Sequence, residues 1–281
     1  MNLIFVYGTL RQGERNHHYL EGSRCIYMQA WVNGQLFDTS YGYPIMKPSD
    51  SVKVFGEVYE VTDAQFDRIN DLEGYIENGS DNLYERVPIT VYNDKGNIIE
   101  AITYVSGRSL EHSIDDIPFG DWKVFQYLQQ ENLLYFAYGS CMDDERFKLA
   151  NVHALFKAIE GKGMLDGHGL RFSKSTSDGG KADIIESKEE YMEGVVYKIS
   201  MEALDYLYKR EGVYNNGYRP AVITIELNGK AVEALTFIGI TKMPETKPTV
   251  LYATEIIRGA TGILNESYIN MLQTKIDLLM K

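Results

Sequence analysis

The stretch Phe5-Val6-Tyr7-Gly8-Thr9-Leu10 closes an apolar run near the start of the chain. A second version of it, Phe136-Ala137-Tyr138-Gly139-Ser140-Cys141, also follows an apolar run. Each predicts a short buried strand that ends in a tight turn, where glycine gives the backbone an unusual φ. Such a turn points several backbone N–H groups toward one place, and clusters of this kind bind anions. An ordinary strand ending is the alternative for either copy taken alone.

The two copies are part of a longer repeat. Four further blocks recur in the same order: Gly56–Val61 with Gly194–Ile199, Leu72–Tyr75 with Arg210–Val213, Tyr84–Val91 with Tyr218–Ile225, and Ala101–Val105 with Ala234–Ile238. The period is far longer than that of solenoid repeats, so the pattern indicates a duplicated domain. A chain of 281 residues also exceeds what one core usually covers. We therefore predict two domains, 1–131 and 132–281, and we expect them to pack together because almost no linker separates them.

Composition narrows the class of protein. The chain carries 28 basic and 40 acidic residues, a net charge of −12, which argues against nucleic acid or an anionic membrane surface as a partner. Its two cysteines, Cys25 and Cys141, fall in different halves and indicate no disulfide framework. The sequence shows no signal peptide and no apolar run of membrane-spanning length. We therefore expect a cytoplasmic enzyme or binding protein.

A glutamate ends a predicted helix in each half. Thr62-Asp63-Ala64-Gln65 has the form of a capping box and predicts a helix start, and Gly74 predicts the end of that helix just after Glu73. Glu211 and Gly212 repeat this ending in the second half. A carboxylate at a helix C-terminus faces the negative end of the helix dipole, which disfavours its ionised form. Such a glutamate is a better base than a free one, the alternative being a solvated side chain at a helix end.

The remaining elements follow from apolar patterning and turn residues. Strands are predicted at 27–32, 34–38, 54–61, 87–92, 98–105, 170–173 and 194–199, with a further one starting at Leu133. Two helices are predicted at the end of the chain, one over 249–258 that Gly259 stops and one from Asn265. The polar, glycine-bearing stretch 175–181 could cradle an anion, although it lacks the spacing of a P-loop.

Taken together, these motifs resemble the γ-glutamylcyclotransferase-like superfamily. The first half is similar to its AIG2-like, γ-glutamylamine cyclotransferase branch, through Tyr7-Gly8-Thr9-Leu10-Arg11, Gly13, Asn16, Gly34-Gln35-Leu36-Phe37-Asp38, Gly56-Glu57-Val58-Tyr59, Leu72-Glu73, Tyr84, Arg86 and Gly120-Asp121-Trp122. The second half is similar to the classical branch, through Tyr138-Gly139-Ser140, Glu211-Gly212-Val213, Pro248-Thr249, Tyr252, Ile256-Ile257, Gly259-Ala260, Gly262-Ile263-Leu264-Asn265 and Tyr268. The matches span nearly the whole chain.

The resemblance implies an α+β fold with a small mixed β-barrel and flanking helices in each half. It also implies a reaction in which the α-amine of a small γ-glutamyl substrate attacks its own γ-carbonyl and forms 5-oxoproline, with Glu73 and Glu211 as general acid/base groups. Neither a metal nor another cofactor is called for. The implied substrate contacts are Tyr7, Gly8, Thr9, Leu10 and Tyr84 in the first half, and Tyr138, Gly139, Ser140, Cys141, Met142, Tyr218 and Tyr252 in the second.

Cys141 departs from the family pattern, which has Asn at this position. Cysteine cannot replace the two donors and the acceptor of an amide, so the second site could differ in substrate or be inactive. Cys141 as a nucleophile is a further alternative, against the usual role of a buried cysteine as a small apolar residue. A different class of function also stays open, a non-catalytic or half-active regulatory protein that binds a γ-glutamyl or amino-acid-like ligand in the same pocket.

Overall fold

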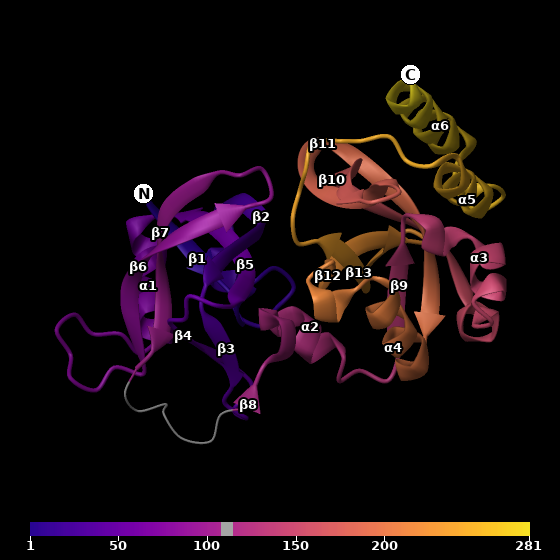
Figure 1. The fold of residues 1–281 in the computed structure, drawn as a ribbon. Coiled ribbons are helices and arrows are strands. Elements are labelled where there is room, and N and C mark those ends of the chain that lie inside the picture. Colours follow the sequence, from indigo (N-terminus) through magenta and orange to yellow (C-terminus); the bar gives the residue numbers. More distant parts are fainter. Residues whose placement is uncertain (108–114) are drawn as a thin grey trace. The chain divides into compact units, whose positions relative to one another are not determined.

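A closed five-stranded β-barrel lies at the centre of each half of the chain (Figure 1). The computed structural model describes residues 1–107 and 115–281, and the chain divides into two units, Met1–Gln126 and Tyr127–Lys281. The prediction of two tandem mixed barrels with flanking helices is therefore confirmed.

The first barrel follows the order β1-β5-β2-β6-β7. Its strands are β1 (Asn2–Val6), β2 (Arg24–Asn33), β5 (Lys53–Val61), β6 (Tyr84–Asn93) and β7 (Ile98–Ser106). Strand β1 runs antiparallel to β5 and parallel to β7, which makes the barrel mixed. A separate three-stranded sheet contains β3 (Gln35–Asp38), β4 (Pro44–Lys47) and β8 (Asp115–Asp116).

The second barrel has the order β10-β11-β9-β13-β12. Its strands are β9 (Leu133–Ala137), β10 (Ile159–Thr176), β11 (Gly179–Ile199), β12 (Tyr218–Leu227) and β13 (Lys230–Gly239). Strand β9 pairs in parallel with β13, as β1 does with β7. The strands predicted at 170–173 and 194–199 are only parts of the long hairpin β10–β11, whose register shifts interrupt the simple alternation of side chains.

Helices flank both barrels. The α-helices are α1 (Asp63–Leu72), α2 (Trp122–Tyr127), α3 (Asp144–Leu149), α4 (Met201–Arg210), α5 (Val250–Ala260) and α6 (Glu266–Met280). Short 3₁₀ turns are η1 (His17–Leu20), η3 (Pro118–Gly120), η4 (Ser140–Met142), η5 (His153–Phe156) and η6 (Val213–Asn215). Among the residues described, no helix has the length and apolarity needed to cross a membrane.

The ends of the helices test the helix starts and stops that the sequence predicts. The capping box at α1 is confirmed, because Thr62 Oγ1 accepts from the Gln65 N–H and Gln65 Oε1 accepts from the Thr62 N–H. The prediction that Gly259 stops α5 is wrong, since the helix continues to Ala260. A Cβ atom at Gly259 would lie 2.5 Å from the carbonyl carbon of Met142. Glycine is needed there so that α5 can pack directly on the turn after β9.

Strand β1 is buried on both faces, which explains why its sequence is apolar throughout. Phe5 belongs to one core cluster, with Val32, Val58 and Trp122 among its members. Ile4 and Val6 belong to a second cluster, which includes Ile69 of α1. The strand is thus fixed from two sides, and the turn that follows it starts from a rigid base.

Candidate active site

The turn after β1 presents backbone donors. The Arg11 N–H bonds to the Gly8 carbonyl oxygen at 3.0 Å, which closes the turn. Within the part of the chain that the structure describes, the N–H groups of Gly8, Thr9 and Leu10 donate no hydrogen bond. The expected unusual φ is wrong, because Gly8 is not in the left-handed region. A Cβ at Gly8 would instead lie 2.7 Å from Pro44 Cγ, so glycine is required by a close approach.

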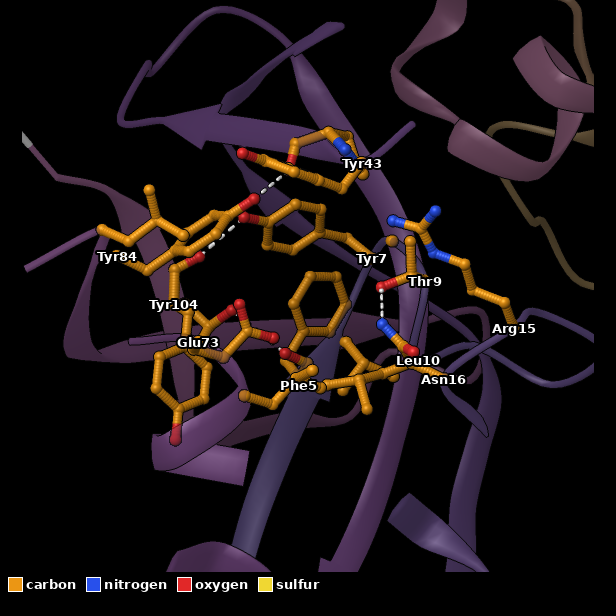
Figure 2. Close-up of a pocket in the computed structure, with 16 residues that line it drawn as sticks. Phe5, Tyr7, Thr9, Leu10, Arg15, Asn16, Tyr43, Glu73, Tyr84 and Tyr104 are labelled. Atoms are coloured by element: carbon orange, nitrogen blue, oxygen red, sulfur yellow. Dashed lines mark hydrogen bonds between the residues drawn. The ribbon is translucent and has the colours of Figure 1, made fainter. Parts of the chain in front are cut away.

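These donors line a pocket of about 230 Å³ (Figure 2). Its lining comprises Phe5, Val6, Tyr7, Gly8, Thr9, Leu10, Arg15, Asn16, Tyr43, Pro44, Leu72, Glu73, Leu83, Tyr84, Thr103 and Tyr104. Every site residue that the sequence suggested for the first half is in this set. The turn, the helix-ending glutamate and the matched tyrosine thus come together although they lie far apart in the sequence.

Glu73 is the only acidic residue in this described lining. It caps the C-terminus of α1, and Gly74 follows with a left-handed φ of 61°. In the described residues its carboxylate has neither a hydrogen bond nor an ion pair, and its side chain points into the same space as Phe5 and Tyr7 (Figure 2). Burial raises the pKa of Glu73 to about 8. At neutral pH the group can therefore both accept and donate a proton.

Two tyrosines form fixed walls beside this carboxylate. Tyr7 Oη donates to the Tyr104 carbonyl oxygen and Tyr84 Oη donates to the Pro44 carbonyl oxygen, each at 2.7 Å. Burial raises the pKa of both phenols well above its ordinary value, so both stay neutral. With their protons committed to the backbone, the two rings shape the pocket rather than exchange protons.

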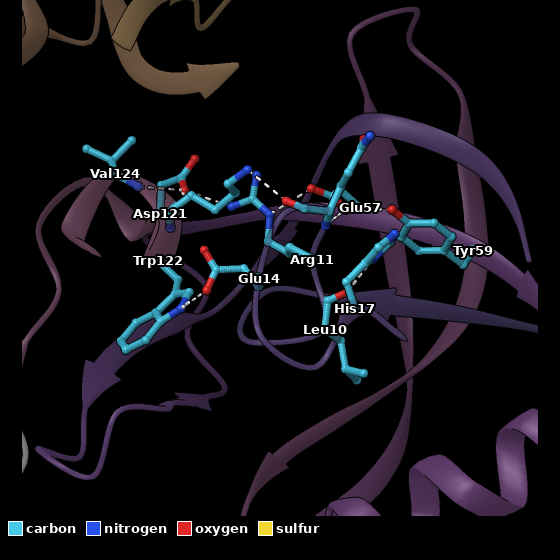
Figure 3. Close-up of polar contacts among 11 residues, drawn as sticks. Leu10, Arg11, Glu14, His17, Glu57, Tyr59, Asp121, Trp122 and Val124 are labelled. Carbon is cyan, nitrogen blue, oxygen red and sulfur yellow. Dashed lines mark hydrogen bonds and ion pairs between the residues drawn. The ribbon is translucent and has the colours of Figure 1, made fainter. Parts of the chain in front are cut away.

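The turn is anchored from behind by a buried ion-pair cluster (Figure 3). Arg11 Nε lies 3.1 Å from Glu57 Oε1, and Arg11 Nη1 lies 2.7 Å from Asp121 Oδ1. The Gln12 N–H donates to the other Glu57 oxygen at 2.8 Å. All three charged side chains are buried. Arg11 directly follows the donors of the turn, so the cluster fixes where those donors point.

The second half contains a matching pocket of about 330 Å³. Its lining comprises Tyr135, Tyr138, Gly139, Ser140, Cys141, Arg146, Lys174, Thr176, Lys181, Ala182, Arg210, Glu211, Gly212, Gly217, Tyr218, Phe237 and Tyr252. Met142, suggested from the sequence, is not among them. It is buried behind the turn, where its carbonyl oxygen accepts from Tyr197 Oη at 3.3 Å.

Matching tyrosines make the same kind of hydrogen bond to the backbone in both pockets. Tyr138 Oη donates to the Phe237 carbonyl oxygen at 2.5 Å, as Tyr7 does to Tyr104. Tyr218 Oη donates to the Ala182 carbonyl oxygen at 2.8 Å, the counterpart of the Tyr84 bond to Pro44. The Ala182 N–H also donates to a second tyrosine of this pocket, Tyr252, at 3.1 Å. The duplication thus extends to the side-chain contacts that shape each pocket.

The glutamate of the second pocket has polar neighbours that Glu73 lacks. Cys141 Sγ lies 3.5 Å from Glu211 Oε1, and Arg210 Nε lies 3.8 Å from the same oxygen. Burial raises the pKa of Glu211, while Arg210 and the Cys141 thiol act in the opposite direction. Burial also raises the pKa of Cys141 to about 11, which keeps it a neutral thiol and disfavours its use as a nucleophile.

Several lining residues were missed from the sequence. In the first pocket they include Arg15, Tyr43, Pro44 and Tyr104, and in the second Arg146, Lys174 and Arg210. Lys181 also lines the second pocket, and it ends the stretch 175–181 for which the sequence suggests an anion cradle. Arg210 could have been noticed, since it directly precedes Glu211. Arg146 comes from α3, and the others come from strands and loops that only the closed barrel brings to the site.

The family models agree with the two-part organisation. One described as gamma-glutamyl cyclotransferase, AIG2-like, matches residues 4–124, and the AIG2-like family matches residues 191–272. A gamma-L-glutamyl-butirosin B gamma-glutamyl cyclotransferase of Niallia circulans is 37% identical over 44% of this chain and 76% of its own length. The gamma-glutamylcyclotransferase of Bos taurus is 33% identical over 46% of this chain and 71% of its own.

One relative matches the chain from end to end. YkqA of Bacillus subtilis, named "Putative gamma-glutamylcyclotransferase YkqA", is 37% identical over 100% of this chain and 99% of its own length. Its crystal structure superimposes with a TM-score of 0.87, covering 99% of this chain and 98% of YkqA. With the repeated pocket and the two family matches, these similarities show that the chain belongs to the γ-glutamylcyclotransferase family, with two domains of that family in tandem.

Proposed function

We propose that this protein is a cyclotransferase that forms 5-oxoproline from γ-glutamyl amines or γ-glutamyl amino acids. One observation carries the proposal: an unpaired carboxylate with a pKa near 8, Glu73, shares a pocket with the unused backbone donors of Gly8, Thr9 and Leu10. A cytoplasmic location is part of the same proposal, and it is supported by Cys25 and Cys141, neither of which forms a disulfide bond in the described residues.

The chemistry needs one proton carrier and one anion site. Glu73 takes a proton from the substrate's α-ammonium, and the freed amine attacks the γ-carbonyl carbon to form the ring C–N bond. The carboxyl group then returns that proton to the leaving nitrogen as the original amide bond breaks. The regenerated carboxylate accepts the second proton of the attacking nitrogen, which leaves the neutral ring amide, and passes that proton to the released amine. The N–H groups of the turn hold the α-carboxylate or the developing oxyanion. Because the attack is intramolecular, the pocket's main task is to hold the folded-back substrate.

A second candidate is a protein with only one working site. The contacts that Arg210 and Cys141 make with Glu211 favour it, because both stabilise the ionised carboxylate and hold it in place. A carboxylate held in this way is a weaker base than Glu73. The second pocket would then bind a γ-glutamyl ligand without turning it over at a comparable rate.

The direct test is release of 5-oxoproline from a panel of γ-glutamyl amines and γ-glutamyl amino acids. We expect product only from substrates with a free α-amine, so the α-N-acetyl form of each substrate serves as its control. Release of glutamate instead of 5-oxoproline would indicate hydrolysis by water. Binding without any product from the folded protein would support the ligand-binding alternative.

We expect the two sites to have different pH–rate profiles. The ionised glutamate is the base, so kcat/KM of the first site should rise about tenfold per pH unit and level off near pH 8, where Glu73 titrates. The rise for the second site should lie at lower pH, because Arg210 and Cys141 favour ionised Glu211. The profiles are measured in Glu211→Gln and Glu73→Gln proteins, respectively. Any fall at higher pH reports the substrate's own α-ammonium and should be common to both, whereas coincident rising limbs would contradict the prediction.

A further inference from the structure

Two lysines face each other on one wall of the second pocket. Lys174 of β10 and Lys181 of β11 are directly opposite partners in the hairpin, and both line the pocket. Like charges at directly opposed positions of an antiparallel pair destabilise the sheet. A protein with a net charge of −12 could easily place an acid at one of these positions. An anion that lay against both ammonium groups would relieve this repulsion.

The surroundings compensate the charge of Lys181 in part, whereas the charge of Lys174 has no carboxylate partner in the described residues. Lys181 Nζ bonds the exposed Asp178 at 2.8 Å and lies 4.5 Å from the ring centre of Tyr252. Lys174 Nζ lies 5.9 Å from the ring centre of Tyr218, and in the described residues it has no carboxylate partner. Both rings belong to the pocket. The two ammonium groups thus stand over the aromatic walls that enclose the substrate space.

The first pocket has an uncharged wall at the equivalent place. The matched tyrosines define the equivalence, since Tyr84 bonds the carbonyl oxygen of Pro44 and Tyr218 bonds that of Ala182. The residue before Pro44 is Tyr43, and the residue before Ala182 is Lys181, so Tyr43 stands in the first pocket where Lys181 stands in the second. Within the described lining, the first pocket has a single cationic side chain, Arg15, while the second has four.

We propose that Lys174 and Lys181 form an anion subsite that binds a carboxylate on the leaving amine. The second domain then selects γ-glutamyl conjugates whose leaving amine is acidic, and the first domain accepts conjugates whose leaving amine is uncharged at this point. The inference rests on the proposed function for its kinetic consequences, but the subsite itself is a statement about binding.

The test uses γ-glutamyl-alanine and γ-glutamyl-alaninamide, which differ by one carboxylate against one carboxamide. In a Glu73→Gln protein, where the second site is the working one, kcat/KM for the acid should exceed that for the amide roughly tenfold, the size expected for a charge-assisted hydrogen bond. In a Lys174→Met/Lys181→Met variant of that protein, the ratio should fall to about one. Lys188→Met, an exposed lysine on the same strand as Lys181, should keep the ratio. An unchanged ratio in an active double variant would overturn the proposal.

Binding separates failure of the subsite from failure of the reaction. Calorimetry with a Glu211→Gln/Glu73→Gln protein should show the acid binding about tenfold more tightly than the amide, and the lysine double variant should lose that preference. If no substrate yields 5-oxoproline but this preference is present, the subsite stands and the cyclotransferase proposal fails. Equal affinities of the two ligands, or a preference that survives both Met substitutions, would overturn the subsite.

Discussion

Glu73→Gln is expected to lower 5-oxoproline release by the first site about a thousandfold, when measured in a Glu211→Gln protein so that the second site contributes no turnover. Glutamine keeps the shape of the side chain and its place at the end of α1, but it cannot take a proton from the α-ammonium. General acid–base groups contribute factors of about 10²–10⁴ to the rate, and here one group serves both transfers. Substrate affinity should change far less than kcat.

The control for this substitution is Glu77→Gln. Glu77 is an exposed acid close to Glu73 in the sequence, so the variant makes the same Glu→Gln substitution outside the pocket. It should retain its rate in the same Glu211→Gln protein. The reciprocal protein, Glu73→Gln alone, reports the second site. Full activity of the Glu73→Gln/Glu211→Gln protein would show that neither carboxyl group is the proton carrier.

The fold could be predicted from the sequence because the residues that determine its main elements lie close together in the chain. Each barrel begins with a buried strand and a Tyr-Gly turn, and each places a glutamate at a helix end that a glycine terminates. A capping box or a left-handed glycine can be recognised within a few residues of itself. Since these blocks recur in order, a duplicated barrel with two candidate acids could be predicted without knowledge of tertiary contacts.

The parts that could not be predicted depend on contacts between distant segments. Gly8 is required because Pro44, on a separate sheet, lies against it. Gly259 is required because α5 crosses the turn after β9. Lys174 and Lys181 meet only because β10 and β11 pair in one particular register. In each case the residue type is locally unremarkable, and its role appears only once the chain has closed into a barrel.

The ion-pair cluster behind the first turn illustrates the same limit and leads to a large expected effect on stability. Arg11→Met should lower the free energy of unfolding of the first unit by about 3–5 kcal/mol, because it leaves two carboxylates, Glu57 and Asp121, buried without their cation. Urea unfolding followed by hydrogen exchange can assign the loss to the first unit, Met1–Gln126. The exchange protection of the second barrel should stay unchanged.

The second barrel suggests the matched control, because it has uncharged residues at the positions that correspond to Arg11 and Glu57. Met142 is the counterpart of Arg11, because the Met142 N–H bonds to the Gly139 carbonyl oxygen as the Arg11 N–H bonds to that of Gly8. Val195 is the counterpart of Glu57, because Val195 pairs with Ala137 at the end of β9 as Glu57 pairs with Val6 at the end of β1. An Arg11→Met/Glu57→Gln/Asp121→Asn protein should therefore recover most of the lost stability. The introduced amide oxygens can still accept the bonds that the Gln12 N–H and Tyr59 Oη donate to Glu57 and that the N–H groups at the start of α2 donate to Asp121. A triple variant as unstable as Arg11→Met would show that the buried cluster is itself net stabilising. Recovery would mean that the cluster holds the turn in place without being the only packing that can do so.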